Sequence, residues 1–222
     1  MDGSVHISKK VIRKKQKMLL DIIQHLDRVG KRQESFLIMV EHIMQCKNPF
    51  IVETGMMRTD DNYEGDGMST LLWHNLINVM KKGSYISIDN SKEAIDFART
   101  KLGLDEFDNK LIHGDSVSTL FRLSRYWDPA NNKIDLLYLD SFDMEFPDPV
   151  PSFTHIMFEF MAVKQFLAKD ALICADDNIR VLRDNETEER YVSKGEYIRQ
   201  YFEKIGNKPI HEGYQIVWRN KV

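Results

Sequence analysis

Residues 50–70 read FIVETGMMRTDDNYEGDGMST, and this stretch decides the fold. A short apolar run ends on Glu53 and is followed by Gly55. A polar loop then leads to Gly67 and to Ser69, where an apolar helical pattern begins. This order of strand, glycine-bearing turn and helix brings a nucleotide-like ligand against bare backbone and a helix N-terminus. A carboxylate at Glu53 would repel a pyrophosphate, but it suits a ligand that carries an amine or hydroxyls.

Apolar runs and helical patterns alternate along the rest of the chain. Strands are predicted at about residues 50–53, 84–89, 110–113, 134–140 and 170–175, and helices near residues 68–80, 92–102, 116–125 and 153–168. Residues 209–218 read as two further β segments that meet at Gly213. The alternation predicts an α/β fold of the Rossmann-like type, with a mostly parallel seven-stranded sheet and helices on both of its faces.

The first 48 residues differ in character from the rest of the chain. Their apolar residues recur at helical spacing on either side of a break at Gly30, and Asn48-Pro49 ends the pattern. We therefore expect an N-terminal helical extension over residues 1–48 and a single ligand-binding domain over residues 49–222. The extension is expected either to pack over the ligand site or to form a dimer contact.

The composition excludes several classes of protein. A net charge of −3 over 222 residues gives no overall attraction to nucleic acid or to an anionic membrane. The two cysteines offer no disulfide framework, and no apolar run is long enough to span a membrane. We expect a cytoplasmic protein that acts on a small molecule, with no nucleic-acid or membrane partner and with a homodimer as an open alternative.

Acidic residues stand at or just beyond the carboxyl ends of all five predicted parallel strands. They are Glu53, Asp89, Asp115, Asp140 and the pair Asp176-Asp177. Because these strand ends meet at one edge of the sheet, the acids should converge on one crevice. Asp89 is placed to accept hydrogen bonds from two ribose hydroxyls, and Asp115 lies one strand further along, where an adenine amino group could be held.

Five segments together resemble the class I S-adenosylmethionine (SAM)-dependent methyltransferases. They are VETGMMR…GDGMST, SIDNSKEAIDFAR, HGDS, YLDSFD and ICADDN, and the resemblance covers about residue 50 to the C-terminus. The pattern is most similar to the metal-assisted small-molecule O-methyltransferases of the catechol and macrocin type. It departs from that family at the first motif, which an insertion at Met56–Glu64 stretches.

The resemblance implies a SAM-dependent methyltransferase that methylates a hydroxyl of a sugar or natural product. The cofactor-binding residues that it implies are Glu53, Gly55, Gly67, Ser69, Asp89, Asp115 and Ser116. Glu53 and Gly55 would face the amino-acid end of the cofactor.

The same family holds a Mg²⁺ ion with an aspartate after the fourth strand and an acidic pair after the fifth. This implies Asp140, Asp176 and Asp177 as metal ligands, with Asn178 as the substitute if the register moves by one residue. Mg²⁺ prefers hard oxygen ligands and would lower the pKa of a substrate hydroxyl. A metal-independent methyltransferase and a bare polar strand end remain the alternatives.

Two residues are candidates for the general base. Asp143 lies three positions after Asp140, where related enzymes place a lysine or histidine. His155 precedes an apolar helix and could instead have a packing or capping role. A histidine can act near neutral pH without perturbation, whereas an aspartate needs a raised pKa.

Polar loops at residues 141–152 and 179–194 come directly after predicted strands, and we interpret them as lids over the substrate. Two other functions fit the same fold. One is an enzyme that binds NAD(P) or another nucleotide, and the other is a non-catalytic assembly protein. The methyl acceptor cannot be identified from the sequence.

Overall fold

The computed structural model describes residues 9–181 and 190–221, and its elements alternate as the sequence predicts. The strands are β1 Phe50–Thr54, β2 Ser84–Asp89, β3 Leu111–His113, β4 Ile134–Leu139, β5 Leu167–Ala175, β6 Asn178–Val181, β7 Arg190–Ser193, β8 His211–Glu212 and β9 Ile216–Arg219. The helices are α1 Lys9–Leu26, α2 Gln33–Gln45, α3 Ser69–Met80, α4 Lys92–Leu102, α5 Ser116–Ser124, α6 Val150–Val163 and α7 Glu196–Lys204, with 3₁₀ turns η1 Gly30–Arg32 and η2 Lys164–Phe166.

Seven strands form one sheet in the order β3-β2-β1-β4-β5-β9-β8. Strands β1 to β5 run parallel, and β9 and β8 close the sheet in antiparallel orientation. The predicted Rossmann-like methyltransferase fold is therefore confirmed, including the antiparallel pair at the end of the chain. The chain moves outward from β1 in one direction and then returns to β4 on the other side. The carboxyl ends of β1 and β4 thus flank the switch point where ligands bind in open α/β sheets.

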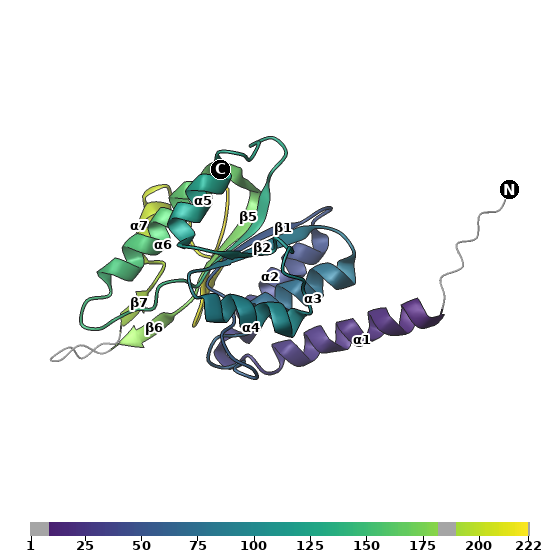
Figure 1. Ribbon diagram of the computed structural model, residues 1–222. Helices are drawn as coiled ribbons and strands as arrows, with labels where there is room; N and C mark the ends of the chain where they lie inside the picture. The colour runs from purple at the N-terminus through teal and green to yellow at the C-terminus, as the bar shows by residue number, and fades with distance from the viewer. Residues whose placement is uncertain (1–8, 182–189, 222) are drawn as a thin grey trace.

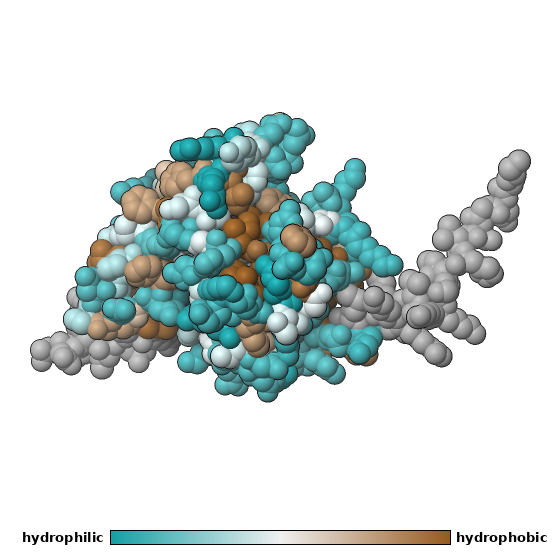
Figure 2. Space-filling model, in the orientation of Figure 1, coloured by the Kyte–Doolittle hydropathy of each residue, from teal (hydrophilic) through white to brown (hydrophobic). Residues whose placement is uncertain are grey.

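Helices cover both faces of the sheet (Figure 1). One apolar cluster joins α1 to α4 to one face, and a second joins α5 to α7 to the other. Helix α2 is fully part of the first cluster, since its Phe36, Met39 and Ile43 have no exposed surface. Helices α1 and α2 thus contribute to one layer of the core. Figure 2 shows a largely hydrophilic surface on one side of the molecule, with hydrophobic residues gathered in a strip between the two helix layers.

The sheet assigns alternate residues to the two layers. In β5, Leu172 and Cys174 belong to the cluster of α1 to α4, whereas Ile173 and Ala175 belong to the other cluster. This is the two-residue period of a strand. The residue after Ala175, Asp176, should therefore face the layer that contains α2.

The structure adds elements where the sequence predicted a loop. The segment predicted as a lid at residues 179–194 contains most of β6 and β7, which pair as an antiparallel hairpin, and residues 182–189 lie outside the described part of the chain. Helix α7 was not predicted, and α6 begins at Val150, inside the other predicted lid. None of the helices in the described residues is long and apolar enough to cross a membrane.

Gly55 is the residue on which the first turn depends. Its φ is +77°, and a Cβ atom there would lie 2.5 Å from the carbonyl oxygen of Asp140. Gly103, which ends α4, has a φ of +65° but has nothing within 4 Å of the corresponding position. The first glycine is thus required by contact as well as by conformation, and the second by conformation alone.

We expect Gly55→Ala to destabilise the protein much more than Gly103→Ala. A left-handed non-glycine residue costs about 1–2 kcal/mol, and the clash at Gly55 adds about 1–3 kcal/mol. Urea unfolding of both variants measures the difference directly. Equal losses would show that the β1 turn moves away from Asp140 without cost.

Candidate active site

A cavity of about 330 Å³ opens at the carboxyl edge of the sheet, at the switch point. Its walls come from the segments that come after β1, β2, β3 and β4 and from the first half of α6. The predicted site residues that line it are Gly55, Asp89, Asp115, Ser116, Asp140, Asp143 and His155. Of the acids that the sequence predicts at the five strand ends, Asp89, Asp115 and Asp140 therefore share one cavity, whereas Glu53, Asp176 and Asp177 do not line it.

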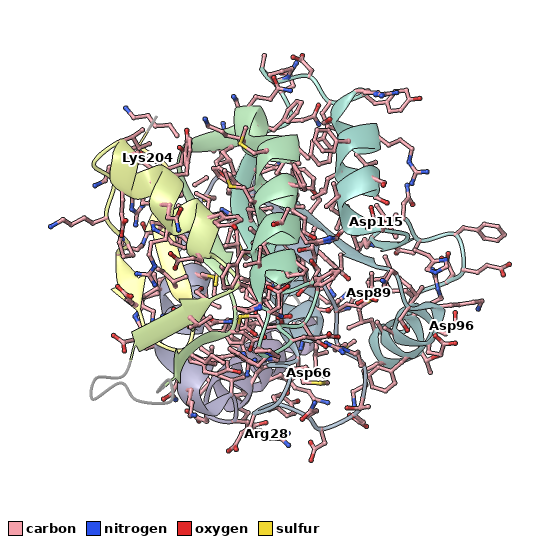
Figure 3. The ribbon with its side chains drawn as sticks, turned by 90° about the vertical axis from the view of Figure 1, so that its left-hand side faces the viewer. Arg28, Asp66, Asp89, Asp96, Asp115 and Lys204 are labelled. Atoms are coloured by element: carbon pink, nitrogen blue, oxygen red, sulfur yellow. The ribbon has the colours of Figure 1, made fainter. Side chains whose placement is uncertain are left out.

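Asp89 and Asp115 lie near one another at the ends of neighbouring strands (Figure 3). The Asp89 carboxylate accepts hydrogen bonds from the backbone N–H groups of Met56, at 3.0 Å, and Ser91, at 2.8 Å. Asp115 caps α5 by accepting from the N–H of Ser118 at 2.8 Å, and this bond lowers the pKa of Asp115. Both acids are thus held in place by backbone and keep lone pairs for a ligand.

His155 projects from α6 toward the end of β3. Its Nε2 lies 2.8 Å from the Ser116 hydroxyl and 3.3 Å from the carboxylate of Glu159, one turn further along the helix. Glu159 is fully buried and also accepts from the hydroxyls of Thr54 and Ser141. Burial alone would lower the pKa of His155, but the Glu159 carboxylate outweighs burial and raises it above 6.5.

Asp143 lies at the rim of the cavity and is more exposed. Its carboxylate oxygens lie 3.3 and 3.4 Å from the guanidinium of Arg58, which belongs to the inserted part of the first turn. Burial alone would raise the pKa of Asp143, but the contact with Arg58 outweighs burial and lowers it. Asp143 is therefore ionised at neutral pH and is a weak proton acceptor.

Asp176 does not face the cavity. It is 0% exposed and forms a bidentate ion pair with Arg32, with Nε–Oδ1 at 3.1 Å and Nη2–Oδ2 at 2.7 Å. Gln215 donates to the same carboxylate at 2.9 Å. Burial alone would lower the pKa of Arg32, but the charge of Asp176 outweighs burial and raises it, so the pair is ionic.

Asp140 and Asp177 share a different cation. The ammonium of Lys194 lies 2.9 Å from Oδ1 of Asp140 and 2.8 Å from Oδ2 of Asp177, and the lysine side chain is 0% exposed. Burial alone would lower the pKa of Lys194, but the two carboxylates outweigh burial and raise it. Tyr214 donates a further hydrogen bond to Asp177 at 2.7 Å.

The predicted arrangement of Asp140, Asp176 and Asp177 around one Mg²⁺ ion differs from what the structure shows. Both oxygens of Asp176 are engaged by Arg32 on the opposite side of the strand end, and Lys194 fills the space between the other two acids. Across residues 9–181 and 190–221, no group of three His, Cys, Asp or Glu side chains is arranged to hold a metal ion. These three residues as they stand do not fit the ion.

Three predicted cofactor-binding residues also lie outside the cavity. Glu53 is fully buried under α3, where it accepts from the Ser87 hydroxyl and where burial raises its pKa to about 7. Gly67 packs against Arg32 and Phe36, and Ser69 is buried in the first turn of α3. The end of the loop at Gly67 therefore packs on the segment of α1 and α2, whereas Gly55 and Arg58 at its start border the cavity.

Several residues of the site were not identified from the sequence. Arg32 and Lys194 are two of them, and they meet acids 144 and 54 positions away in the chain. Glu159 and Phe142 are two more, and the ring of Phe142 lies 5.0 Å from that of His155. The spacing of His155 and Glu159, four apart on a helix, was the one signal available.

Comparisons with known proteins add weak likenesses. No family model and no curated protein matches the chain. Among solved structures it is similar to the MycE methyltransferase from the mycinamycin biosynthetic pathway in complex with Mg and SAH, with 16% identity, 66% of this chain and 32% of that chain covered, and a TM-score of 0.43. It is also similar to human methyltransferase-like protein 13 in complex with SAH, with 12% identity, 94% and 82% covered, and a TM-score of 0.43.

A third similar structure is SAM-bound CalS10, an amino pentose methyltransferase from Micromonospora echinaspora, with 9% identity, 99% and 100% covered, and a TM-score of 0.44. The chain spans about a third of the length of the MycE chain. Likenesses at this level do not establish a family, so the function has to be inferred from the site itself.

We expect Arg32→Met to destabilise the protein by about 3–5 kcal/mol, because it leaves Asp176 buried without a counterion. Adding Asp176→Leu to that variant should recover part of the loss, and urea unfolding measures both. The matched control is Arg28→Met, which removes the exposed ion pair with Asp61 and should leave the unfolding transition nearly unchanged. The single variant Asp176→Leu completes the comparison. If the double variant loses as much free energy of unfolding as Arg32→Met and Asp176→Leu lose together, the pairing is contradicted.

Proposed function

We propose that this protein is a SAM-dependent methyltransferase that methylates an oxygen atom of a small molecule. The observation that carries the proposal is the acidic lining of the cavity at the switch point. Asp89, Asp115, Asp140 and Asp143 all border it, beside the bare backbone of Gly55. SAM carries a sulfonium, an amine and two ribose hydroxyls, and carboxylates complement all of these groups.

The acidic lining argues against a dinucleotide cofactor. A pyrophosphate in this cavity would lie among four carboxylates, and Arg58, the one cation in the described part of the lining, is already paired with Asp143. In the sequence, Glu53 was the acid expected to repel the pyrophosphate of NAD(P), but it is buried away from the cavity. Asp89 and Asp115 border the cavity and supply the same repulsion.

His155 is the residue that we assign as general base. It borders the cavity, and Ser116 and Glu159 fix the orientation of its ring. Its raised pKa makes it a better proton acceptor than Asp143, whose pKa is lowered. In the proposed reaction, the acceptor oxygen gives its proton to His155 as the methyl group moves from sulfur to oxygen. The protein's further contribution is to hold the acceptor oxygen in line with the methyl carbon and sulfur.

The proposed reaction includes no step through Mg²⁺, because its predicted ligands are engaged by Arg32 and Lys194. A sugar or natural-product hydroxyl remains the acceptor class that the sequence resemblance suggests. The size of the cavity, about 330 Å³, lies within the range of small-molecule and cofactor sites and supports its assignment to the cofactor.

The first test is calorimetric titration of S-adenosylhomocysteine into the wild type and Asp89→Asn. We expect micromolar binding to the wild type, weakened by about 10- to 100-fold in the variant, because a hydrogen bond to a charged group contributes about 1.5–3 kcal/mol. The matched control is Asp96→Asn on the exposed face of α4, which should bind like the wild type (Figure 3).

The opposite pattern would overturn the proposal. If NADH binds the wild type and S-adenosylhomocysteine does not, the protein is a nucleotide-binding enzyme on the same fold. If S-adenosylhomocysteine binds but no acceptor supports turnover, the result favours a non-catalytic assembly protein that retains the fold. Thermal unfolding of each variant shows whether it remains folded.

His155 should titrate above its ordinary pKa of 6.5. In Glu159→Gln the carboxylate that stabilises the imidazolium is lost, while burial continues to lower the pKa, so the midpoint should fall below that of the wild type. Proton NMR of the histidine ring measures both midpoints. If His155 is the base, kcat/KM for the acceptor should rise with pH through the same midpoint.

His113 provides the internal control for this titration. Its ring contacts the backbone oxygen of Asn90 and not Glu159, so its resonances should be the same in the two proteins. A His155 midpoint that does not move in Glu159→Gln would remove Glu159 from the account of the base.

A further inference from the structure

We propose that the ammonium of Lys194 is a built-in cation that takes the place of a divalent metal between Asp140 and Asp177. Its importance for methyl transfer rests on the proposed function, but its occupancy of the cation position does not. The sequence resembles metal-assisted enzymes at these acids, whereas the structure places a lysine among them.

Three carboxylates from two strand ends surround the ammonium. Nζ lies 2.9 Å from Asp140 after β4, 2.8 Å from Asp177 after β5, and 3.7 Å from Asp143 in the loop that continues from Asp140. The two short contacts are charge-assisted hydrogen bonds. A lysine supplies three N–H donors from one point, so one ammonium can bond to Asp140 and Asp177 while Asp143 stays within ion-pair distance.

The backbone next to Lys194 is closely packed. The next residue, Gly195, packs on the ends of β5 and β9, where a Cβ atom would lie 2.7 Å from Ala175 and 3.0 Å from Trp218. The N–H of Gly195 also donates to the Ser193 hydroxyl at 3.0 Å. The backbone from which the Lys194 side chain extends is therefore held in place, and the side chain itself is 0% exposed.

A metal ion and this ammonium cannot share the site. Mg²⁺ binds oxygens at about 2.0–2.1 Å and keeps several waters, so it needs the space that the lysine occupies. Removing Lys194 from that space would bury two aspartates without their counterion and expose an ammonium that is now paired. The intact protein should therefore leave divalent cations unbound at this position.

Lys194 is a positioning residue, since its side chain is covered and does not reach the cavity. It acts through Asp140, whose side chain is 17% exposed and borders the cavity. The lysine fixes this carboxylate beside Gly55 and provides locally the positive charge that a metal provides in the enzymes that the sequence resembles.

Binding of Mn²⁺ to the full chain, followed by the electron paramagnetic resonance of free Mn²⁺, tests the proposal without substrate or cofactor. We expect no site-specific binding to the wild type, meaning no difference between the wild type and Asp177→Asn. Lys194→Ala should bind Mn²⁺ at least tenfold more tightly than the wild type, and adding Asp177→Asn should abolish the gain. The matched control is Lys164→Ala, which removes a lysine that lies over the Tyr201 ring and should gain nothing.

Two results would overturn the proposal. One is Mn²⁺ binding by the wild type that Asp177→Asn removes, which would show that the metal displaces the lysine. The other is a folded Lys194→Ala protein that binds Mn²⁺ no better than the wild type. If Lys194→Ala does not fold by circular dichroism, the comparison of wild type with Asp177→Asn decides alone. S-adenosylhomocysteine binding to the same samples reports separately on the proposed function.

Discussion

The acids at the carboxyl ends of β4 and β5 can be buried only because two cations are buried with them. Arg32 pairs with Asp176, and Lys194 lies between Asp140 and Asp177, so two cations compensate most of the charge of three acids. A carboxylate that is left alone in a protein interior is strongly destabilising, so each acid requires its cation. One cation comes from the helical section before β1 and the other from the segment after the β6–β7 hairpin. Both segments therefore contribute side chains that the acids at the ends of β4 and β5 require.

This division of charge also decides which acids remain for a ligand. Asp89 and Asp115 are held by backbone N–H groups, which fix their positions but leave their negative charge in place. Asp143 lies between these cases, because its partner Arg58 is itself partly exposed at the rim. The negative charge is consequently uncompensated where β2 and β3 end and largely compensated where β4 and β5 end. A ligand with a cationic centre and hydroxyls fits this gradient better than a phosphate does.

Periodicity alone predicted the regular elements closely. The predicted strand at 84–89 and helix at 92–102 match β2 and α4 in full. What periodicity could not give was the direction of a side chain at a strand end. A one-residue difference exchanges the two faces of a sheet, and Asp176 falls on the face that α2 covers. The Arg32 partner lies 144 residues away, and nothing in the local sequence indicates such a distant ion pair. The β6–β7 hairpin was missed because its residues are polar enough to read as a loop.

Tertiary packing separates the resemblance in sequence from the chemistry of the site. A pattern such as YLDSFD or ICADDN fixes where carboxylates stand along the chain, but the cation that each one meets is chosen by packing between distant segments. An acid opposite a buried lysine is a different chemical group from an acid opposite an open, hydrated position. Here α6 supplies His155 with its buried partner Glu159 at the cavity, where the proposed reaction needs a proton acceptor. Proton transfer can then be assigned to an imidazole and charge compensation to a lysine, two tasks that a single metal ion would otherwise combine.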